Sequence, residues 1–256
     1  MTKVSIVTVC FNSEKSLINC LMSVAEQSHH DVEHIIIDAC SDDSTVSIIE
    51  NYKIESKHEV KFVSEKDDGI YDAMNKGIKL SSGDIVAFLN SDDVYQDKFT
   101  IQYVVSLFDP SKLAVCGGTV FINELNDVKR VWKPSCPRWY NYSIGWSLPH
   151  PSLFVRREVF EKIGQFDLDF TRCADYDWTI RMIKNMTGSQ LLTTDEPFTR
   201  MRVGGITNRG FLSKLENTAQ LFLARKRNFS YLSACIGLIG NILFKFTQFI
   251  KREDLF

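Results

Sequence analysis

Short apolar runs alternate with helical patterns through the first 90 residues, and this alternation restricts the fold more than any other feature. Val4–Cys10 and Ile85–Leu89 are β-branched runs of strand length, which suit buried parallel strands. Between such runs the apolar residues take helical spacing, as at Leu17, Leu21 and Val24. The alternation predicts an α/β fold with a mainly parallel sheet flanked by crossover helices.

The same patterns predict further strands and helices along the chain. Further strands are predicted at 34–38, 61–64 and 113–121, and helices at 14–26, 45–52, 72–80, 157–163 and 175–186. An aromatic, proline-marked loop is predicted from Trp132 to Pro151.

Composition limits the class of protein. The chain has 256 residues, 44% apolar, with 30 basic and 32 acidic side chains. These values exclude a disordered chain, and the lack of a basic excess argues against a nucleic-acid binder. The seven cysteines are scattered and form no CxxC pair, which favours reduced thiols. The first residues also lack a signal-peptide pattern, so a cytosolic protein is expected.

The C-terminal segment differs in charge from the rest. Residues 209–256 carry eight basic and three acidic side chains, a net charge of +5, against −7 for residues 1–208. We therefore predict one domain at 1–208 and a basic, amphipathic helical tail at 209–256. The tail either lies on a membrane surface, which we favour, or packs on the domain or a second subunit. Its uncharged stretch between Arg227 and Lys245 is shorter than the roughly 20 residues of a comfortable span.

Polar residues follow three of the predicted strands, at Phe11-Asn12, Asp38 and Ser91-Asp92-Asp93. Ligands of open α/β sheets bind at the carboxyl ends of strands, so these residues are expected to share one rim. A carboxylate pair there suits a hard divalent cation that also binds substrate phosphates. The alternative for Asp92 and Asp93 is a helix cap with a first-turn acid.

A series of segments then identifies a family. These are VSIVTVCFNS, HIIIDACSDDST, SEKDDGIYDAMNKG, SSGDIVAFLNSDDVY, HPSLFVRREVFEKIGQFD and ADYDWTIRM. In order and spacing they resemble the family 2 inverting glycosyltransferases of GT-A fold over residues 1–208. The resemblance is to the bacterial enzymes of O-antigen, capsule and exopolysaccharide synthesis.

The resemblance implies a nucleotide site at the end of the first strand. Val9, Phe11 and Asn12 would line the uracil and ribose of a UDP-sugar, with Glu14 beside them. Val9 and Cys10 stand where the family commonly has Pro and Thr. The alternative for Phe11 is core packing.

Three later residues complete the donor site that the resemblance implies. Asp38 would accept a hydrogen bond from the N–H of uracil, since a carboxylate only accepts. The glycine that commonly follows is absent, because Ala39 and Cys40 stand there. Asp68 and Asn75 lie in the segment that would close over the nucleotide; the alternative is a surface turn and a capped helix.

The resemblance also assigns a metal site and a catalytic base. Asp93 would bind Mg²⁺ or Mn²⁺ directly, and Asp92 would face the ribose or the metal. The cation would stabilise the departing diphosphate. Asp175 would take the proton of the acceptor hydroxyl, with helix capping as its alternative. Asp177 is instead expected to be solvated or paired with Arg181 at i+4.

Four residues are assigned to the acceptor or the diphosphate. Trp146 would contact sugar rings and His150 the acceptor, a phosphate or the metal. Core packing and a hydrogen-bonded structural histidine are their alternatives. Arg200 and Arg202 would contact the diphosphate, for which arginine has suitable geometry; an ordinary strand is the alternative.

The resulting prediction is an inverting, metal-dependent hexosyltransferase. It would use a UDP-sugar donor and a polyprenyl-diphosphate-linked sugar acceptor at the inner face of the bacterial inner membrane. A homodimer is the alternative to membrane contact for the C-terminal tail. A non-catalytic nucleotide-sugar-binding or scaffold protein of the same pathway is the alternative function. A nucleotide-dependent oxidoreductase is disfavoured because no G-x-G-x-x-G turn follows the first strand.

Overall fold

A computed structural model describes residues 2–123, 125–134, 139–143, 146–202 and 211–238. The strands are β1 (Val4–Cys10), β2 (Val32–Asp38), β3 (Glu59–Ser64), β4 (Ile85–Phe88), β5 (Val94–Tyr95), β6 (Ala114–Ile122), β7 (Val128–Trp132), β8 (Leu153–Arg156) and β9 (Leu191–Arg202). The helices are α1 (Leu17–Ala25), α2 (Thr45–Glu55), α3 (Ile70–Leu80), α4 (Thr100–Ser106), α5 (Trp139–Ser143), the 3₁₀ turn η1 (His150–Ser152), α6 (Arg157–Ile163), α7 (Ala174–Lys184) and α8 (Phe211–Asn228).

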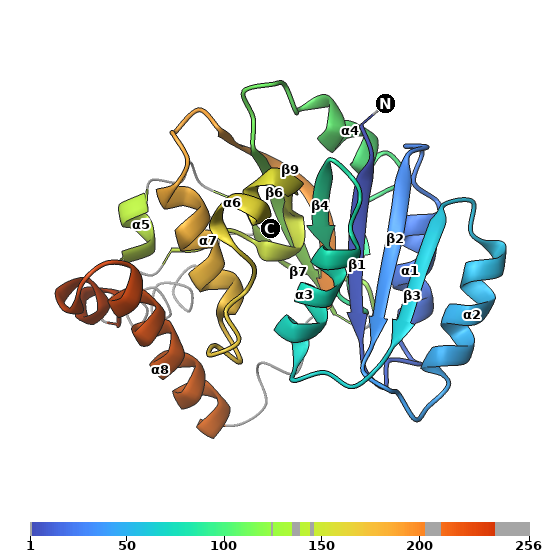
Figure 1. The fold of residues 1–256 in the computed structure, drawn as a ribbon, viewed down its shortest axis with the longest axis horizontal. Coiled ribbons are helices and arrows are strands. Elements are labelled where there is room, and N and C mark those ends of the chain that lie inside the picture. Colours follow the sequence, from blue (N-terminus) through green and yellow to red (C-terminus); the bar gives the residue numbers. More distant parts are fainter. Residues whose placement is uncertain (1, 124, 135–138, 144–145, 203–210, 239–256) are drawn as a thin grey trace.

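The strands form one mixed sheet in the order β3-β2-β1-β4-β8-β6-β9-β5, and β7 pairs with β6 (Figure 1). Neighbours from β3 to β4 are all parallel. Beyond β4 the sheet is mixed, because β8 runs antiparallel to both β4 and β6. The predicted α/β fold with a mainly parallel sheet is therefore confirmed.

Four strands were not predicted, namely β5, β7, β8 and β9. β5 and β8 are short, and β7 and β9 carry charged residues that obscure a strand pattern; a strand was named at β9 only as the alternative for Arg200 and Arg202. The predicted loop from Trp132 to Pro151 also contains α5 and the start of η1.

Helices cover both faces of the sheet. On one face, Tyr71 and Met74 of α3 and Trp178 of α7 pack with alternate residues of β1 and β4. On the other face, α1 and α4 pack against the residues of opposite parity, through Val24 and Ile101 among others. Because both faces are covered, every residue of β1 and β2 is buried, which explains the apolar run of β1 and the Ile35–Ile37 run of β2.

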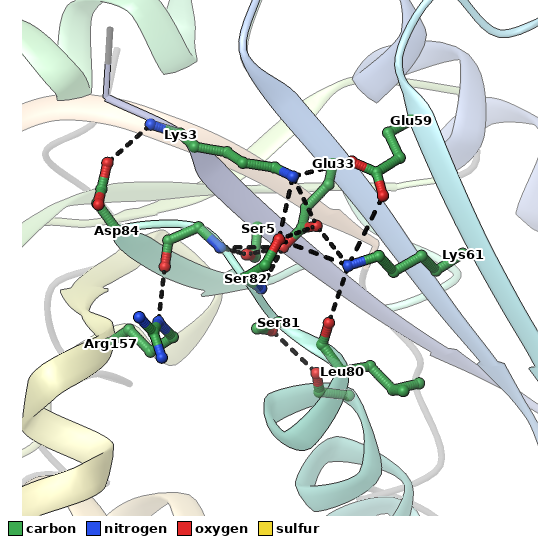
Figure 2. Close-up of polar contacts among 12 residues, drawn as sticks. Lys3, Ser5, Glu33, Glu59, Lys61, Leu80, Ser81, Ser82, Asp84 and Arg157 are labelled. Atoms are coloured by element: carbon green, nitrogen blue, oxygen red, sulfur yellow. Dashed lines mark hydrogen bonds and ion pairs between the residues drawn. The ribbon is translucent and has the colours of Figure 1, made fainter.

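A buried ion cluster closes the amino-terminal edge of the parallel strands (Figure 2). The carboxylate of Glu33 in β2 is wholly enclosed and accepts hydrogen bonds from Ser5 Oγ, at 2.5 Å, and Lys61 Nζ, at 2.8 Å. Ser82 donates to it through its backbone N–H and its hydroxyl, at 2.6 and 2.7 Å. This cluster ties β1, β2, β3 and the α3–β4 turn together at the edge opposite the carboxyl ends of these strands.

The first helix of the predicted tail packs on the domain. α8 lies beside α7 (Figure 1), where Asn228 Nδ2 donates to Asp177 Oδ1 at 2.6 Å. Arg225 is buried and its Nε donates to Tyr176 Oη at 2.9 Å, while Arg227 is paired with Asp167. Two of the basic residues that suggested a membrane-facing tail are thus held by the protein itself.

Residues 231–238 are also helical, and the rest of the predicted tail, 239–256, lies outside the described residues. Gly237 allows this segment a close approach, since a Cβ there would lie 2.5 Å from the carbonyl oxygen of Ser143. Within the part of the chain that the structure describes, no helix is long and apolar enough to cross a membrane.

Candidate active site

The turns that follow β1, β2 and β4 are joined at one rim of the sheet, as the sequence predicts. The backbone N–H of Asn12 donates to Ser41 Oγ at 2.8 Å, which links the first turn to the second. Ser13 Oγ lies 3.0 Å from Ser91 Oγ, which links the first turn to the Asp92–Asp93 turn. The parallel neighbours β2, β1 and β4 place all three turns at the same edge.

The first turn presents its residues to solvent. Phe11 is 60% exposed, so the core-packing alternative is wrong for this residue. Asn12 has a φ of 48°, and its side-chain oxygen accepts from the N–H of Asp42 at 3.0 Å. Glu14 is exposed and accepts from the N–H of Ser44 at 3.2 Å. Val9 remains buried in β1, so a contact from it to a ligand would come through the backbone.

Asp38 is enclosed and bonded to its own turn and to β3. Its carboxylate accepts from the N–H of Ser41 at 3.0 Å, from the Ser41 hydroxyl and from Ser64 Oγ at 2.6 Å. Cys10 Sγ lies 3.8 Å from Oδ1, but the carbonyl oxygen of Ile37 is the nearer acceptor for its one proton, at 3.6 Å. A carboxylate has about four acceptor positions, so the three donors from Ser41 and Ser64 leave room for one more. Asp38 therefore holds the turn after β2, and its contact with uracil stays a prediction.

Asp68 and Asn75 have different surroundings. Asp68 is exposed, and its N–H donates to Asp72 Oδ2 at 3.2 Å. Asn75 is buried, and its amide forms two hydrogen bonds with the backbone of Phe166, at 2.9 and 3.0 Å. Asn75 therefore joins α3 to the segment before α7. No local pattern showed this bond, since the partner lies 91 residues away, and the nucleotide contact of Asn75 stays a prediction.

The Asp92–Asp93 pair is the strongest candidate for cation binding. Asp93 has no exposed surface, and burial followed by the charge of Asp92 raises its pKa well above the usual value. Asn90 Nδ2 donates to Asp93 Oδ2 at 3.0 Å. Asp93 Oδ1 and Asn90 Oδ1 are buried acceptors with no hydrogen-bond partner among the described residues.

Unpaired buried acceptors are costly unless something satisfies them, and a hard cation takes oxygen ligands. The donor set therefore fits Mg²⁺ or Mn²⁺. It is a sparse set, because no group of three or more His, Cys, Asp or Glu suited to a metal occurs in the described ranges. A cation held by one or two carboxylates and by substrate phosphates matches this arrangement.

Two arginines of β9 lie beside this pair. β9 runs antiparallel to β5, and Arg200 pairs with Val94, the residue that follows Asp93. Arg200 Nε donates to Gln96 Oε1 at 3.1 Å. Burial raises the pKa of Asp92, and the positive charge of Arg202 partly offsets that rise. The charge of Arg202 therefore reaches Asp92 from β9.

Asp175 lies in the first turn of α7 and is partly exposed. Tyr71 Oη donates to its Oδ1 at 2.7 Å. Since Tyr71 lies in the first turn of α3, which follows the carboxyl end of β3, this bond holds Asp175 at the rim. Asp177 is buried and bonds to Arg181 Nε at 2.9 Å, as predicted for the i+4 alternative. Asp175 is therefore the accessible acid of the two.

His150 and Trp146 face the core on this side of the sheet. The imidazole of His150 stacks on Phe88, with ring centroids 5.3 Å apart. Both of its nitrogens are buried with no hydrogen-bond partner among the described residues, contrary to the structural alternative. Burial lowers the pKa of His150, although the charge of Asp175 acts in the opposite direction. Trp146 packs edge-on against Tyr142 at 5.0 Å, which agrees with its core-packing alternative.

Comparison with known proteins decides the family. Residues 5–164 match the family described as Glycosyl transferase family 2.

The chain belongs to glycosyl transferase family 2.

Relatives of this family 2 glycosyltransferase are found in mycobacteria. An uncharacterized glycosyltransferase of Mycobacterium tuberculosis is 32% identical over 181 residues, covering 70% of this chain and 68% of the relative. A PGL/p-HBAD biosynthesis glycosyltransferase of Mycobacterium bovis is 28% identical over 191 residues, covering 71% and 70%. The enzyme class, a glycosyltransferase, is therefore established.

Solved structures agree on the fold. Staphylococcus aureus TarS 1–349 in complex with UDP-GlcNAc superposes with a TM-score of 0.72 at 18% identity, covering 99% of this chain and 76% of that one. The mannosyltransferase PcManGT of Pyrobaculum calidifontis, in complex with GDP-Man and Mn²⁺, gives a TM-score of 0.66 at 19% identity, covering 99% and 81%. The fold of this family 2 glycosyltransferase is thus the GT-A fold.

The sequence interpretation missed two residues of this glycosyltransferase. Tyr71 and Asn90 both touch a predicted site acid, Asp175 and Asp93 respectively. Asn90 had a local signal, since it stands three positions before Asp93. Tyr71 had none, because its partner lies 104 residues away.

Proposed function

We propose that this family 2 glycosyltransferase moves a hexose from a UDP-sugar, with inversion, to a polyprenyl-diphosphate-linked sugar in bacterial surface polysaccharide synthesis. One observation carries the proposal. The partly exposed carboxylate Asp175 is held at the strand edge that also bears the Asp92–Asp93 pair. An acid free to accept a proton beside a site suited to a diphosphate is what a single displacement at an anomeric carbon requires.

The donor diphosphate would lie between the acidic pair and β9. Asp92 is the more accessible acid, so we propose it as the first contact of Mg²⁺ or Mn²⁺, with Asp93 and Asn90 behind it. This reverses the order that the resemblance implied for the pair. A bound cation would neutralise charge that develops on the leaving diphosphate. Arg202 supplies a fixed positive charge on the same side.

The transfer step needs one base. Asp175 would accept the proton of the acceptor hydroxyl while that oxygen bonds to the anomeric carbon of the donor. The bond from this carbon to the diphosphate oxygen breaks, and UDP leaves with the electron pair. One in-line displacement inverts the anomeric configuration, so an α-linked donor would give a β-linked product.

Nucleotide contacts would come from the exposed first turn. Phe11 offers an aromatic face to the base, and Asn12 and Glu14 are exposed beside it. Asp38 would hold the turn after β2 and accept a hydrogen bond from the N–H of uracil. UDP is favoured as the nucleotide because TarS binds UDP-GlcNAc on the same fold, and GDP is the rival because PcManGT binds GDP-Man.

A lipid-linked acceptor is supported by the surface of the C-terminal segment. Tyr231, Leu232 and Ile236 are large apolar residues that are 65, 70 and 46% exposed. Such a surface suits the interfacial region of a membrane. We therefore propose peripheral contact with the inner face of the inner membrane through the segment 209–256, with burial of this surface in a homodimer as the rival. Liposome co-sedimentation, with and without anionic lipid, separates the two.

The test is a transfer assay. UDP-Glc, UDP-Gal, UDP-GlcNAc, UDP-GalNAc and GDP-Man are incubated with synthetic GlcNAc- or GalNAc-diphosphate lipid and Mg²⁺ or Mn²⁺, and the product anomer is assigned by NMR. Transfer is expected from a UDP-sugar, and Asp92→Ala and Asp175→Asn should abolish it. Asp169→Asn, at an exposed loop position, is the matched control and should stay active.

The outcomes separate the alternatives. Near wild-type transfer by both Asp92→Ala and Asp175→Asn would overturn the site assignment. Retention of the donor's anomeric configuration would overturn the inverting mechanism. Calorimetric UDP binding without turnover of any donor would instead favour a non-catalytic binding protein.

A further inference from the structure

The hydroxyl of Tyr71 makes a contact that the proposed mechanism does not use. It donates to Oδ1 of Asp175 at 2.7 Å, joining the first turn of α3 to the first turn of α7. Tyr71 is only 9% exposed, and its ring packs against Phe166 with centroids 5.6 Å apart. The ring is therefore fixed by the core, so the hydroxyl has one place to point.

Tyr71 can act only as a donor in this contact. Burial, and then the charge of Asp175, raise the pKa of Tyr71 well above its ordinary value. The phenol therefore keeps its proton at neutral pH. A permanent neutral donor on one carboxylate oxygen stabilises the charged form of that carboxylate.

Other titratable groups face Asp175 from the elements around it. His150 lies on η1 and Tyr142 on α5, and the charge of Asp175 acts on the pKa of both. Cys173 precedes α7 and feels the same charge. None of these three donates to the Asp175 carboxylate in the described residues, whereas Tyr71 does.

We propose that Tyr71 is a positioning residue for Asp175, holding Oδ1 so that Oδ2 is the oxygen presented to the acceptor hydroxyl. This inference rests on the proposed role of Asp175 as the base. Rotation about the terminal bond of an aspartate is broad when nothing restrains it. The Tyr71 bond removes that freedom, and a fixed orientation is what a base needs before the acceptor arrives.

The position of Tyr71 also links the base to the donor. α3 begins directly after Asp68 and Gly69, in the segment that the sequence predicts to close over the nucleotide. Gly69 has a φ of 112°, which other residues adopt only with backbone strain. The start of α3 therefore requires glycine at this position. An ordered donor segment would thus order the start of α3 and, through Tyr71, the base.

The first test needs no substrate. The full chain is labelled with ¹³C at the aspartate carboxyl carbons, and Asp175→Asn identifies the Asp175 resonance. In Tyr71→Phe the titration midpoint of this resonance should move to higher pH by about half a unit or more, because the charged form loses a hydrogen bond. An unchanged midpoint would overturn the proposal.

Tyr52→Phe is the matched control. Tyr52 is also buried, and its hydroxyl bonds to His34 Nδ1 at 2.9 Å, but it lies on α2, away from the helix α7 that bears Asp175 (Figure 1). This variant loses a comparable bond without touching Asp175, so the Asp175 midpoint should stay in place. An equal movement in Tyr52→Phe would mean that the shift reports general loosening, and would overturn the positioning role.

A second substitution guards against misfolding of Tyr71→Phe. 3-Fluorotyrosine placed at position 71 keeps the size of the ring and makes the phenol a stronger donor. It should move the Asp175 midpoint to lower pH, opposite in direction to Tyr71→Phe. A shift to higher pH, or none, would contradict the proposal.

Kinetics then separate this proposal from the proposed function. With the donor found in the transfer assay, Tyr71→Phe should lower kcat about tenfold, leave KM for the donor within twofold, and move the acidic limb of the rate profile to higher pH. If Asp175→Asn is inactive and Tyr71→Phe matches wild type, only the positioning role fails. If Asp175→Asn remains active, the base assignment itself fails.

Discussion

Replacing Glu33 with glutamine gives a prediction that can be worked from the structure. The carboxylate is wholly enclosed in β2 (Figure 2). Its Oε1 accepts from Ser5 Oγ, Ser82 N and Gly83 N at 2.5, 2.6 and 3.1 Å. In Glu33→Gln these three bonds can persist, but each changes from a charge-assisted bond to a neutral one of about half the strength.

The other oxygen of Glu33 loses more. Oε2 lies 2.8 Å from Lys61 Nζ and 3.1 Å from Lys3 Nζ, and an amide nitrogen there would face both ammonium groups. Breaking a buried ion pair costs about 3–5 kcal/mol. Both lysines are partly exposed and keep Glu59 as a partner, which lies 2.8 Å from Lys3 Nζ and 3.7 Å from Lys61 Nζ. We therefore expect the low end, a loss of about 3 kcal/mol in the free energy of unfolding.

Urea unfolding followed by circular dichroism measures this loss. In thermal unfolding the same loss should lower the melting temperature by roughly 6–12 °C, at about 2–4 °C per kcal/mol. Glu59→Gln is the matched control, because it touches the same two lysines from a side chain that is 52% exposed; it should cost less than about 1 kcal/mol. Equal losses in the two variants would refute the reasoning, as would a loss below about 1 kcal/mol in Glu33→Gln.

The pH dependence has a definite sign. Burial alone would raise the pKa of Glu33, but hydrogen bonds from Lys61, Ser5 and Ser82 outweigh it and lower the pKa well below its ordinary value. A depressed acid pKa contributes stability above the unfolded value, about 4.3, and loses it as pH falls toward the folded value. The difference in unfolding free energy between wild type and Glu33→Gln should therefore be full at pH 7 and shrink below about pH 4.

Three further predictions concern the site and its support. Phe11→Ala should weaken UDP binding about tenfold in calorimetry, since base–aromatic stacking is worth about 1–3 kcal/mol, while thermal stability stays unchanged because Phe11 is exposed. His150→Phe should leave the free energy of unfolding equal or higher, because it removes two unpartnered buried nitrogens, yet lower transfer at least tenfold. Gly77→Ala should destabilise the fold by about 1–3 kcal/mol in urea, since its Cβ would lie 2.3 Å from Val7 Cγ1.

A specific result would contradict each of these three predictions. Unchanged UDP affinity in Phe11→Ala would remove that ring from the nucleotide site. Wild-type transfer by His150→Phe would make His150 a packing residue. A fully stable Gly77→Ala would mean that α3 can move away from β1 without cost.

The sequence indicated the parallel half of the sheet because its physical signal is local. Burial on both faces leaves apolar runs in β1, β2 and β4, and each of these runs ends where the polar rim begins. The rim residues Phe11, Asp38 and Asp92 could thus be named in advance. Their order in space could not, since it follows from the strand order β2-β1-β4, which no local pattern encodes.

The net charge of the C-terminal segment was a poor guide to which of its side chains face solvent. The +5 of residues 209–256 suggested a basic surface, but Arg225 is buried against Tyr176 and Arg227 is paired with Asp167. A count of charges ignores partners contributed by distant elements, and only packing reveals them.

The sequence by itself determined the fold class, the family resemblance and which acids are candidates for the site, because periodicity and motif spacing are properties of neighbouring residues. Tertiary structure alone decided the partners of each acid, because their donors lie far away in the sequence. Ser64 of β3 donates to Asp38, and Asn228 of α8 donates to Asp177. Asp175 stays partly exposed, and its long-range partner Tyr71 donates to one of its two carboxylate oxygens.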